Sequence, residues 1–180
     1  MKKLYGITIL ILGLFLTINS KAQSGRSRLI GIQPAVTVEP FYEEGEFDIN
    51  IFPFVYEMRM GMRTNLRLVP IVNYHFGGEE NGVSDLGLSL VMPVFIKPVE
   101  SLEAKTYGFY LGPVFGFGRN ALNEHYTATL ALEPGYMWET QKSFTINLGL
   151  QLGTSYFIND AEPNEWLFHW GPKVTFGFWF

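Results

Sequence analysis

The chain has 180 residues, of which 47% are hydrophobic, 16% are aromatic and 17% are charged, whereas about a quarter are charged in a typical soluble domain. It contains no cysteine, which excludes disulfide bonds, thiolate chemistry and membrane attachment by the lipoprotein route. The formal net charge is −4 at pH 7, and an acidic balance of this kind argues against nucleic acid as a partner.

The first residues have the features of a secretory signal peptide. Two lysines are followed by an apolar stretch (residues 7–18), and a small-x-small pattern ending at Ala22 then precedes the expected cleavage site. We therefore expect residues 1–22 to be a signal peptide that is cleaved after Ala22. Residues 23–180 then form one domain, in which ten basic residues stand against seventeen acidic ones.

Beyond the expected signal peptide, apolar and polar residues alternate through nearly the whole sequence, which is typical of strands with two different faces. The clearest case lies between Ser143 and Ile158, where Phe144 and Leu148 share one face and Asn147 lies on the other. The alternation predicts eight antiparallel strands in up-and-down order, at residues 29–40, 47–62, 66–76, 84–97, 105–119, 125–139, 143–158 and 165–180.

The sizes of the two faces predict which one points outward. One face has five or six large apolar residues per strand, whereas the other is small and polar and contains glycines such as Gly112, Gly135 and Gly149. Because an eight-stranded barrel is only wide enough inside for side chains to fill it, the bulky face is expected to point outward and meet lipid. We thus predict an all-β fold, an eight-stranded antiparallel transmembrane β-barrel. The alternative is a soluble periplasmic, lipocalin-like binder with its apolar face around a ligand.

Seven prolines are at odds with uninterrupted strands, because proline lacks the N–H group that a central strand needs. They are Pro34, Pro53, Pro70, Pro93, Pro113, Pro134 and Pro172. Near Pro53 the alternation slips by one residue, as a β-bulge would cause, and we expect the other prolines to mark bulges too. If they mark breaks instead, a soluble sandwich of shorter strands is the alternative fold.

The chain ends on alternating residues with Val174, Phe176, Phe178 and Phe180 on one face. This end resembles the C-terminal signal that outer-membrane barrels present to their insertion machinery. The layout from Leu29 onward resembles small Gram-negative barrels of the OmpA/OmpX type, within the broad family of porin-like outer-membrane β-barrel domains. The resemblance implies an outer-membrane location, with membrane lipid, lipopolysaccharide and the barrel-insertion machinery as partners.

The turns and adjoining rim expected on the outer side are strongly acidic, notably at Glu43–Glu46, Asp48 and Glu79–Glu80, while basic residues gather on the periplasmic side. The acidic turns offer carboxylates to divalent cations, although they lack an EF-hand-like spacing. A solvated rim of negative potential is the simpler interpretation.

One group of inward-facing residues suggests chemistry. His125, Ser155 and Glu165 fall toward the outer end, as a Ser/His/carboxylate group of an outer-membrane lipid A acylhydrolase or acyltransferase would require. No local motif of such an enzyme surrounds them, so we expect no catalytic activity. The histidines lack zinc-ligand spacing, and we expect no metal and no cofactor.

A second inward group is a predicted lumen network, made of Glu57, Arg59, Arg67, Glu133, His169 and Lys173. Charges confined in a narrow bore need partners, so we expect them to pair and to plug the barrel. These features together predict an integral outer-membrane protein of structural or surface-interaction type. A narrow porin-like channel, in which the ion pairs exchange partners, and a lipid A-modifying enzyme are the alternatives.

Overall fold

The structure is a computed structural model that describes residues 27–37, 43–77, 81–100, 104–122, 125–140, 143–158 and 164–180. The predicted signal peptide and the acidic pair Glu79–Glu80 lie outside the described residues. Within these ranges, no helix is long and apolar enough to cross a membrane.

The described residues form eleven strands. These are β1 (Arg28–Ile32), β2 (Val36–Thr37), β3 (Phe47–Asn50), β4 (Phe54–Arg59), β5 (Asn65–Phe76), β6 (Gly82–Val91), β7 (Val94–Phe95), β8 (Gly108–Asn120), β9 (Tyr126–Glu139), β10 (Phe144–Ile158) and β11 (Glu165–Trp179).

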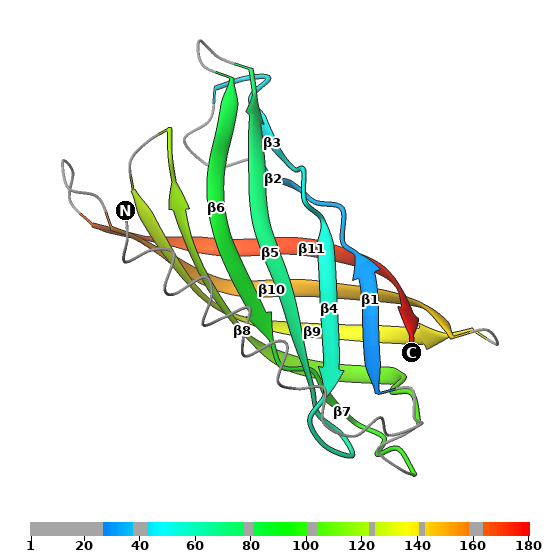
Figure 1. The fold of residues 1–180 in the computed structure, drawn as a ribbon. Coiled ribbons are helices and arrows are strands. Elements are labelled where there is room, and N and C mark those ends of the chain that lie inside the picture. Colours follow the sequence, from blue (N-terminus) through cyan, green and yellow to red (C-terminus); the bar gives the residue numbers. More distant parts are fainter. Residues whose placement is uncertain are drawn as a thin grey trace, which may run out of the picture.

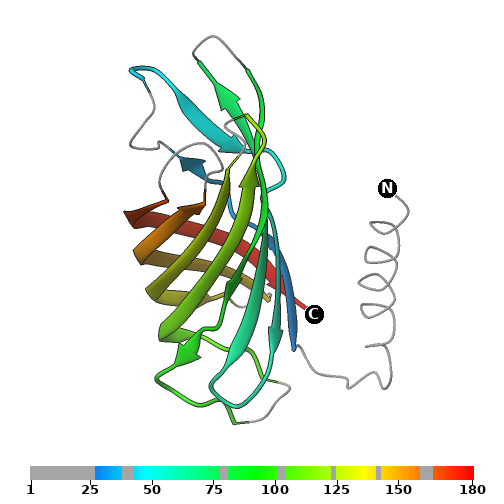
Figure 2. The ribbon, with the colours of Figure 1, turned by 90° about the vertical axis from the view of Figure 1, so that its left-hand side faces the viewer.

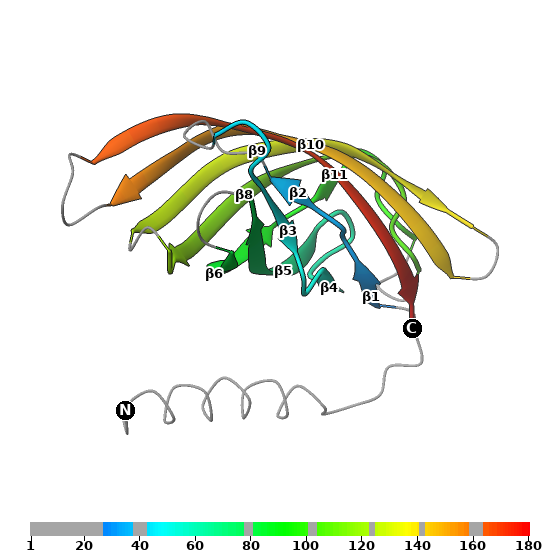
Figure 3. The same cartoon turned by 90° about the horizontal axis from the view of Figure 1, so that it is seen from above.

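The strands close into one eight-stranded antiparallel barrel (Figures 1 and 2). Around the ring the order is β1, β4, β5, β6, β8, β9, β10 and β11, and β11 pairs with β1 to close it. The short strands β2, β3 and β7 belong to the first, second and fourth predicted segments. Seen from above, β8 to β11 arch over the other strands, so the barrel is flattened (Figure 3). The predicted all-β class, strand number and antiparallel order are confirmed.

The two faces of the strands are distributed as the alternation predicts. The outward side chains Leu148, Phe176 and Phe178 are 42%, 38% and 58% exposed. Among the described residues, 19 polar or charged residues are buried against 11 hydrophobic ones. The bulky apolar face therefore points away from the barrel, and the interior is mainly polar.

Three of the seven prolines interrupt a strand. Pro34 lies between β1 and β2, Pro53 between β3 and β4, and Pro93 between β6 and β7. Only at Pro53 does the facing slip, because Ile51 and Phe52 are both exposed between the buried positions that flank the break. The slip predicted at this proline is confirmed, and the breaks do not prevent the sheet from closing.

The other four prolines lie inside continuous strands with regular register, so the expectation of a bulge at each of them is wrong. They are Pro70, Pro113, Pro134 and Pro172. The register shift in β5 falls between Val72 and Tyr74, beyond the proline of that strand.

The interrupted strands explain how two of these prolines are accommodated. The Pro70 carbonyl accepts a hydrogen bond from the Asn50 side chain (3.1 Å), and the Pro113 carbonyl accepts one from the Met92 backbone (3.0 Å). The N–H and C=O of a residue in an antiparallel strand face the same neighbouring strand. The position of the missing N–H of each proline therefore faces the neighbouring strand at the point where that strand is broken. A break in one strand therefore lies beside the proline of the next.

Several glycines leave room for large side chains inside the barrel. A Cβ atom on Gly135 would collide with the Tyr110 ring, and one on Gly149 would lie 2.8 Å from the Glu133 carboxylate. One on Gly177 would lie 2.7 Å from Leu29. These glycines are thus needed for the close packing of the lumen.

We expect Gly149→Ala to destabilise the folded barrel by about 1–3 kcal/mol, because the added methyl overpacks the site of Glu133. The matched control is Gly118→Ala, where the nearest atom to the new Cβ is the Leu86 carbonyl oxygen at 3.6 Å. Urea unfolding of the purified proteins, followed by tryptophan fluorescence, measures both variants. Equal midpoints would contradict the proposed crowding.

Candidate functional site

The centre of the lumen holds one arginine between two glutamates. Arg67 Nε donates to Glu57 Oε2 at 2.7 Å, and Arg67 Nη1 donates to Glu133 Oε1 at 2.9 Å. The register of β4 and β5 sets Glu57 directly opposite Arg67, and Glu133 reaches the guanidinium from β9. All three side chains are fully buried. Ion pairs this deep must be well hydrogen-bonded to offset their desolvation.

Further donors satisfy both carboxylates. Asn65 Nδ2 donates to Glu57 Oε1 at 2.5 Å. The Tyr110 hydroxyl donates to Glu133 Oε1 at 2.6 Å, and Gln151 Nε2 donates to Glu133 Oε2 at 2.7 Å. We call these residues the plug: Glu57, Asn65, Arg67, Tyr110, Glu133 and Gln151. The plug links β4, β5, β8, β9 and β10 across the lumen.

An apolar cluster occupies the lumen at the end where β1 begins and β11 ends, which we call the base. Among its buried members are Leu29, Val55, Phe95, Met137 and Trp179. The sequence predicts a lumen of small and polar residues, and this part of the prediction is wrong. Large apolar side chains fit here because neighbouring positions such as Gly177 are glycine.

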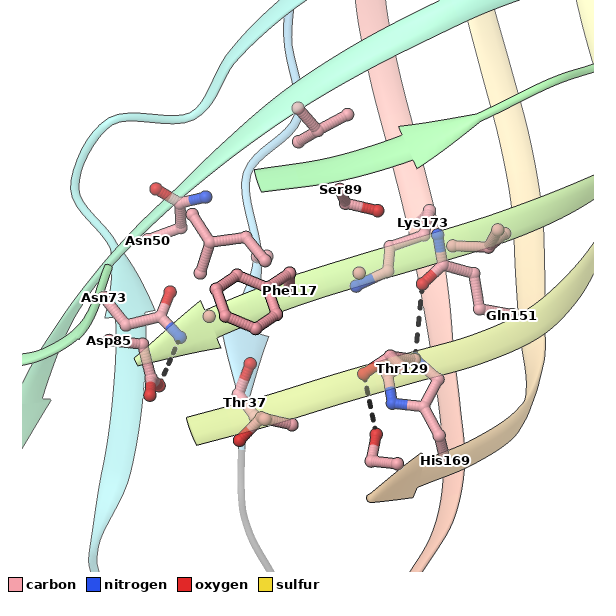
Figure 4. A pocket seen from close by; sticks show the side chains of 18 of the residues that line it. Thr37, Asn50, Asn73, Asp85, Ser89, Phe117, Thr129, Gln151, His169 and Lys173 are labelled. Atoms are coloured by element: carbon pink, nitrogen blue, oxygen red, sulfur yellow. Dashed lines mark hydrogen bonds between the residues drawn. The ribbon is translucent and has the colours of Figure 1, made fainter. Parts of the chain in front are cut away.

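A cavity of about 240 Å³ lies in the other half of the barrel, toward the end where β5 ends and β11 begins, which we call the top (Figure 4). Its polar wall includes Asn73, which donates to Asp85 at 3.0 Å, and Thr129, whose hydroxyl lies 2.8 Å from that of Ser155. Its apolar wall includes Val69, Ile71, Val114 and Leu167. The cavity is therefore amphipathic.

A second buried cluster lies at the top. Asp48 Oδ2 accepts a hydrogen bond from the Ser84 hydroxyl at 2.8 Å, and Asp48 Oδ1 lies 2.9 Å from His75 Nδ1. Charge patterning in the sequence places Asp48 on the acidic outer rim and does not predict this cluster. The alternation does predict an inward side chain at Asp48, because this residue falls between the outward residues Phe47 and Ile49.

The predicted lumen network is brought together in part. Three of its members meet in the plug, and His169 Nε2 lies 3.3 Å from the plug residue Gln151. Lys173 lines the cavity, whereas the Arg59 guanidinium lies 5.9 Å from the Trp179 ring centroid at the base. Sequence reasoning missed Asn65, Tyr110 and Gln151 as partners, although alternation places Gln151 on the inward face.

The three residues considered for catalysis are not adjacent in the strand register. Ser155 is opposite Thr129 in the β9–β10 ladder, and His125 lies four residues before Thr129 in the chain, a separation of about 13 Å in extended backbone. Glu165 is exposed at the start of β11. Within the described ranges, no group of three or more His, Asp or Glu residues could hold a metal ion.

The terminal residues expected to form an assembly signal lie on or beside β11. Phe176, Phe178 and Phe180 are exposed, and Val174 is half-buried. Of the acidic turns, Glu43 and Glu44 are exposed.

No protein-family model, curated protein or solved structure matches this chain. Its function is therefore argued from the barrel itself.

We expect Arg67→Met to destabilise the barrel by roughly 3–5 kcal/mol, because Glu57 and Glu133 then remain buried without their cation. The control is Arg63→Met in the exposed turn before β5, for which we expect a change below about 1 kcal/mol. Urea midpoints of the reconstituted proteins provide the comparison. If both variants had the same urea midpoint as the wild type, the plug would not contribute to the stability of the barrel.

Proposed function

We propose that the chain is an integral outer-membrane β-barrel protein of structural or surface-interaction type, whose lumen is closed by the plug. The observation that carries this proposal is the inverted distribution of side chains. Among the described residues, 33 large hydrophobic residues are exposed, while the fully buried side chains include Glu57, Arg67 and Glu133.

A water-soluble barrel would have the opposite arrangement. Soluble proteins rarely expose contiguous apolar patches of more than a few hundred Å², and burying one large apolar side chain contributes about 1.5–3 kcal/mol. For 33 partly exposed side chains, transfer from water to hydrocarbon contributes tens of kcal/mol in total. A bilayer is the solvent that suits this surface, because a closed barrel satisfies its backbone groups within the sheet.

The sequence supports the outer membrane as the location. The signal-peptide pattern before Ala22 directs export, and the aromatic alternation at Phe176, Phe178 and Phe180 resembles the signal read by the barrel-insertion machinery. In this arrangement the base faces the periplasm, and the acidic turn at Glu43–Glu44 faces outward toward lipopolysaccharide. These features also support membership in the OmpA/OmpX-like class of small barrels.

The plug and the apolar base support a non-conducting protein. They adjoin one another, since the plug residue Tyr110 also belongs to the apolar cluster, and both consist of buried side chains. An eight-stranded barrel has little open lumen even without such closure. This arrangement favours a structural or surface role over a porin-like channel.

We expect the protein to stay in the outer-membrane pellet and to migrate faster on gels when unboiled. Leu148→Arg should abolish or weaken the fast-migrating form, since a lipid-facing arginine near the bilayer centre costs about 2–4 kcal/mol. Ile96→Arg, at an exposed position just after β7, is the matched control and should behave as wild type. Release of the wild type by osmotic shock, with Leu148→Arg tolerated, would refute the membrane location.

In planar lipid bilayers we expect no conductance steps above the protein-free baseline, because the plug and the base close the lumen. The control is a bilayer exposed to the same detergent without protein. Defined steps that disappear in the Lys173→Met variant would instead favour the narrow channel.

A further inference from the structure

The barrel wall has a gap in its hydrogen-bond ladder between β11 and β2. The β1–β11 ladder runs from Leu29–Trp179 to Ile32–Phe176 and ends there. A side-chain contact follows, with the Thr175 hydroxyl donating to Gln33 Oε1 at 3.0 Å. Beyond it, within the described residues, β2 pairs with β3 and no ladder joins it to β11. We call this gap the seam.

The cavity reaches both edges of the seam. Ala35 and Thr37 line it from the β2 side, and Leu167 and His169 line it from β11. The outward residues next to the seam on β11 include Trp170, which is exposed. Non-helical backbone at membrane depth is tolerated where it lines a cavity. The outward residues Phe168 and Trp170 of β11 also line the cavity, so the cavity reaches the outer surface of the barrel beside the seam.

Lys173 is the cation of this cavity, and its side chain points into it (Figure 4). Glu133 attracts it through space, but among the described residues no group forms an ion pair or hydrogen bond with Lys173. The carboxylate of Glu133 is already occupied by Arg67, Tyr110 and Gln151. The ammonium group of Lys173 thus has N–H donors available to a ligand in the cavity.

We propose that this cavity binds a single-chain fatty acid, with the carboxylate on Lys173 and the acyl chain leaving through the seam into the bilayer. The inference rests on the proposed membrane location. A volume of about 240 Å³ is below the ~300–1,000 Å³ of sites that enclose a whole drug-sized ligand, so it suits a headgroup and the first part of a chain. The apolar wall at Val69, Ile71 and Leu167 matches those methylenes.

The probe is palmitate labelled with ¹³C at the carboxyl carbon, added to lipid nanodiscs that contain the purified barrel. We expect a second carboxyl resonance, in a one-to-one ratio to the barrel and absent from empty nanodiscs. Lys173→Met should weaken binding at least about tenfold, because a charge-assisted hydrogen bond is lost. The matched control Lys97→Met, which removes an exposed lysine just after β7, should bind as wild type.

A second variant tests the cavity independently of charge. Ser89 lines the cavity opposite Gly116, so Ser89→Phe should fill it and abolish the bound resonance while the gel-mobility shift shows an intact barrel. A bound resonance that persists in both Lys173→Met and Ser89→Phe, or none in the wild type, would overturn the proposal. Butyrate supplied from water and binding as tightly as palmitate would assign the site to a soluble anion and overturn entry through the seam.

The two proposals fail separately. A protein that leaves the membrane fraction refutes the membrane location, whereas a heat-modifiable outer-membrane barrel without bound palmitate refutes the fatty-acid site alone.

Discussion

The structure depends on the sharing of Arg67 between Glu57 and Glu133. Neither carboxylate has another cation within ion-pair distance among the described residues, and both are fully buried. Because they come from β4 and β9, their common partner on β5 ties together strands that do not pair with each other. Buried charges must be paired and hydrogen-bonded, and the lumen provides partners for them. The outward positions, by contrast, hold mainly apolar side chains.

Close packing in the lumen and hydrogen bonding in the wall determine where glycine and proline are accommodated. Glycine is needed inside at Gly135 and Gly149, where Tyr110 and Glu133 occupy the space of a side chain. Proline is tolerated where the neighbouring strand is interrupted, as at Pro70 beside the break that contains Pro53. In the proposed membrane location, a donor that proline lacks is best placed where the neighbouring strand lacks an acceptor, since no water can substitute in hydrocarbon. Paired interruptions meet this requirement at Pro70 and Pro113.

Alternation along the chain predicted the features that follow from a period of two: strand number, order and the direction of each face. The same alternation placed Glu57, Arg67 and Glu133 inside. It could not predict which inward residues meet, because contacts across a lumen depend on barrel stagger and on the register of non-neighbouring strands. The Asp48–His75–Ser84 cluster, the apolar base and the seam all depend on that stagger. Charge alone therefore misplaced Asp48 on the outer rim, although its phase along β3 is inward.

The closed base and the proposed opening at the seam together determine access to the cavity. Arg67 and its two glutamates close the path along the barrel axis below the cavity, so a molecule cannot reach Lys173 from the base without unfolding the plug. In the proposed membrane location, a ligand that enters through the seam passes directly from the bilayer into the cavity, so its hydrocarbon chain stays out of water. An amphiphile already dissolved in the membrane needs to desolvate only its headgroup, and Lys173 offers that headgroup a counter-charge where it arrives. In the proposed membrane location, the plug closes the path along the barrel axis, and the seam leaves the lipid phase as the proposed route to the cavity.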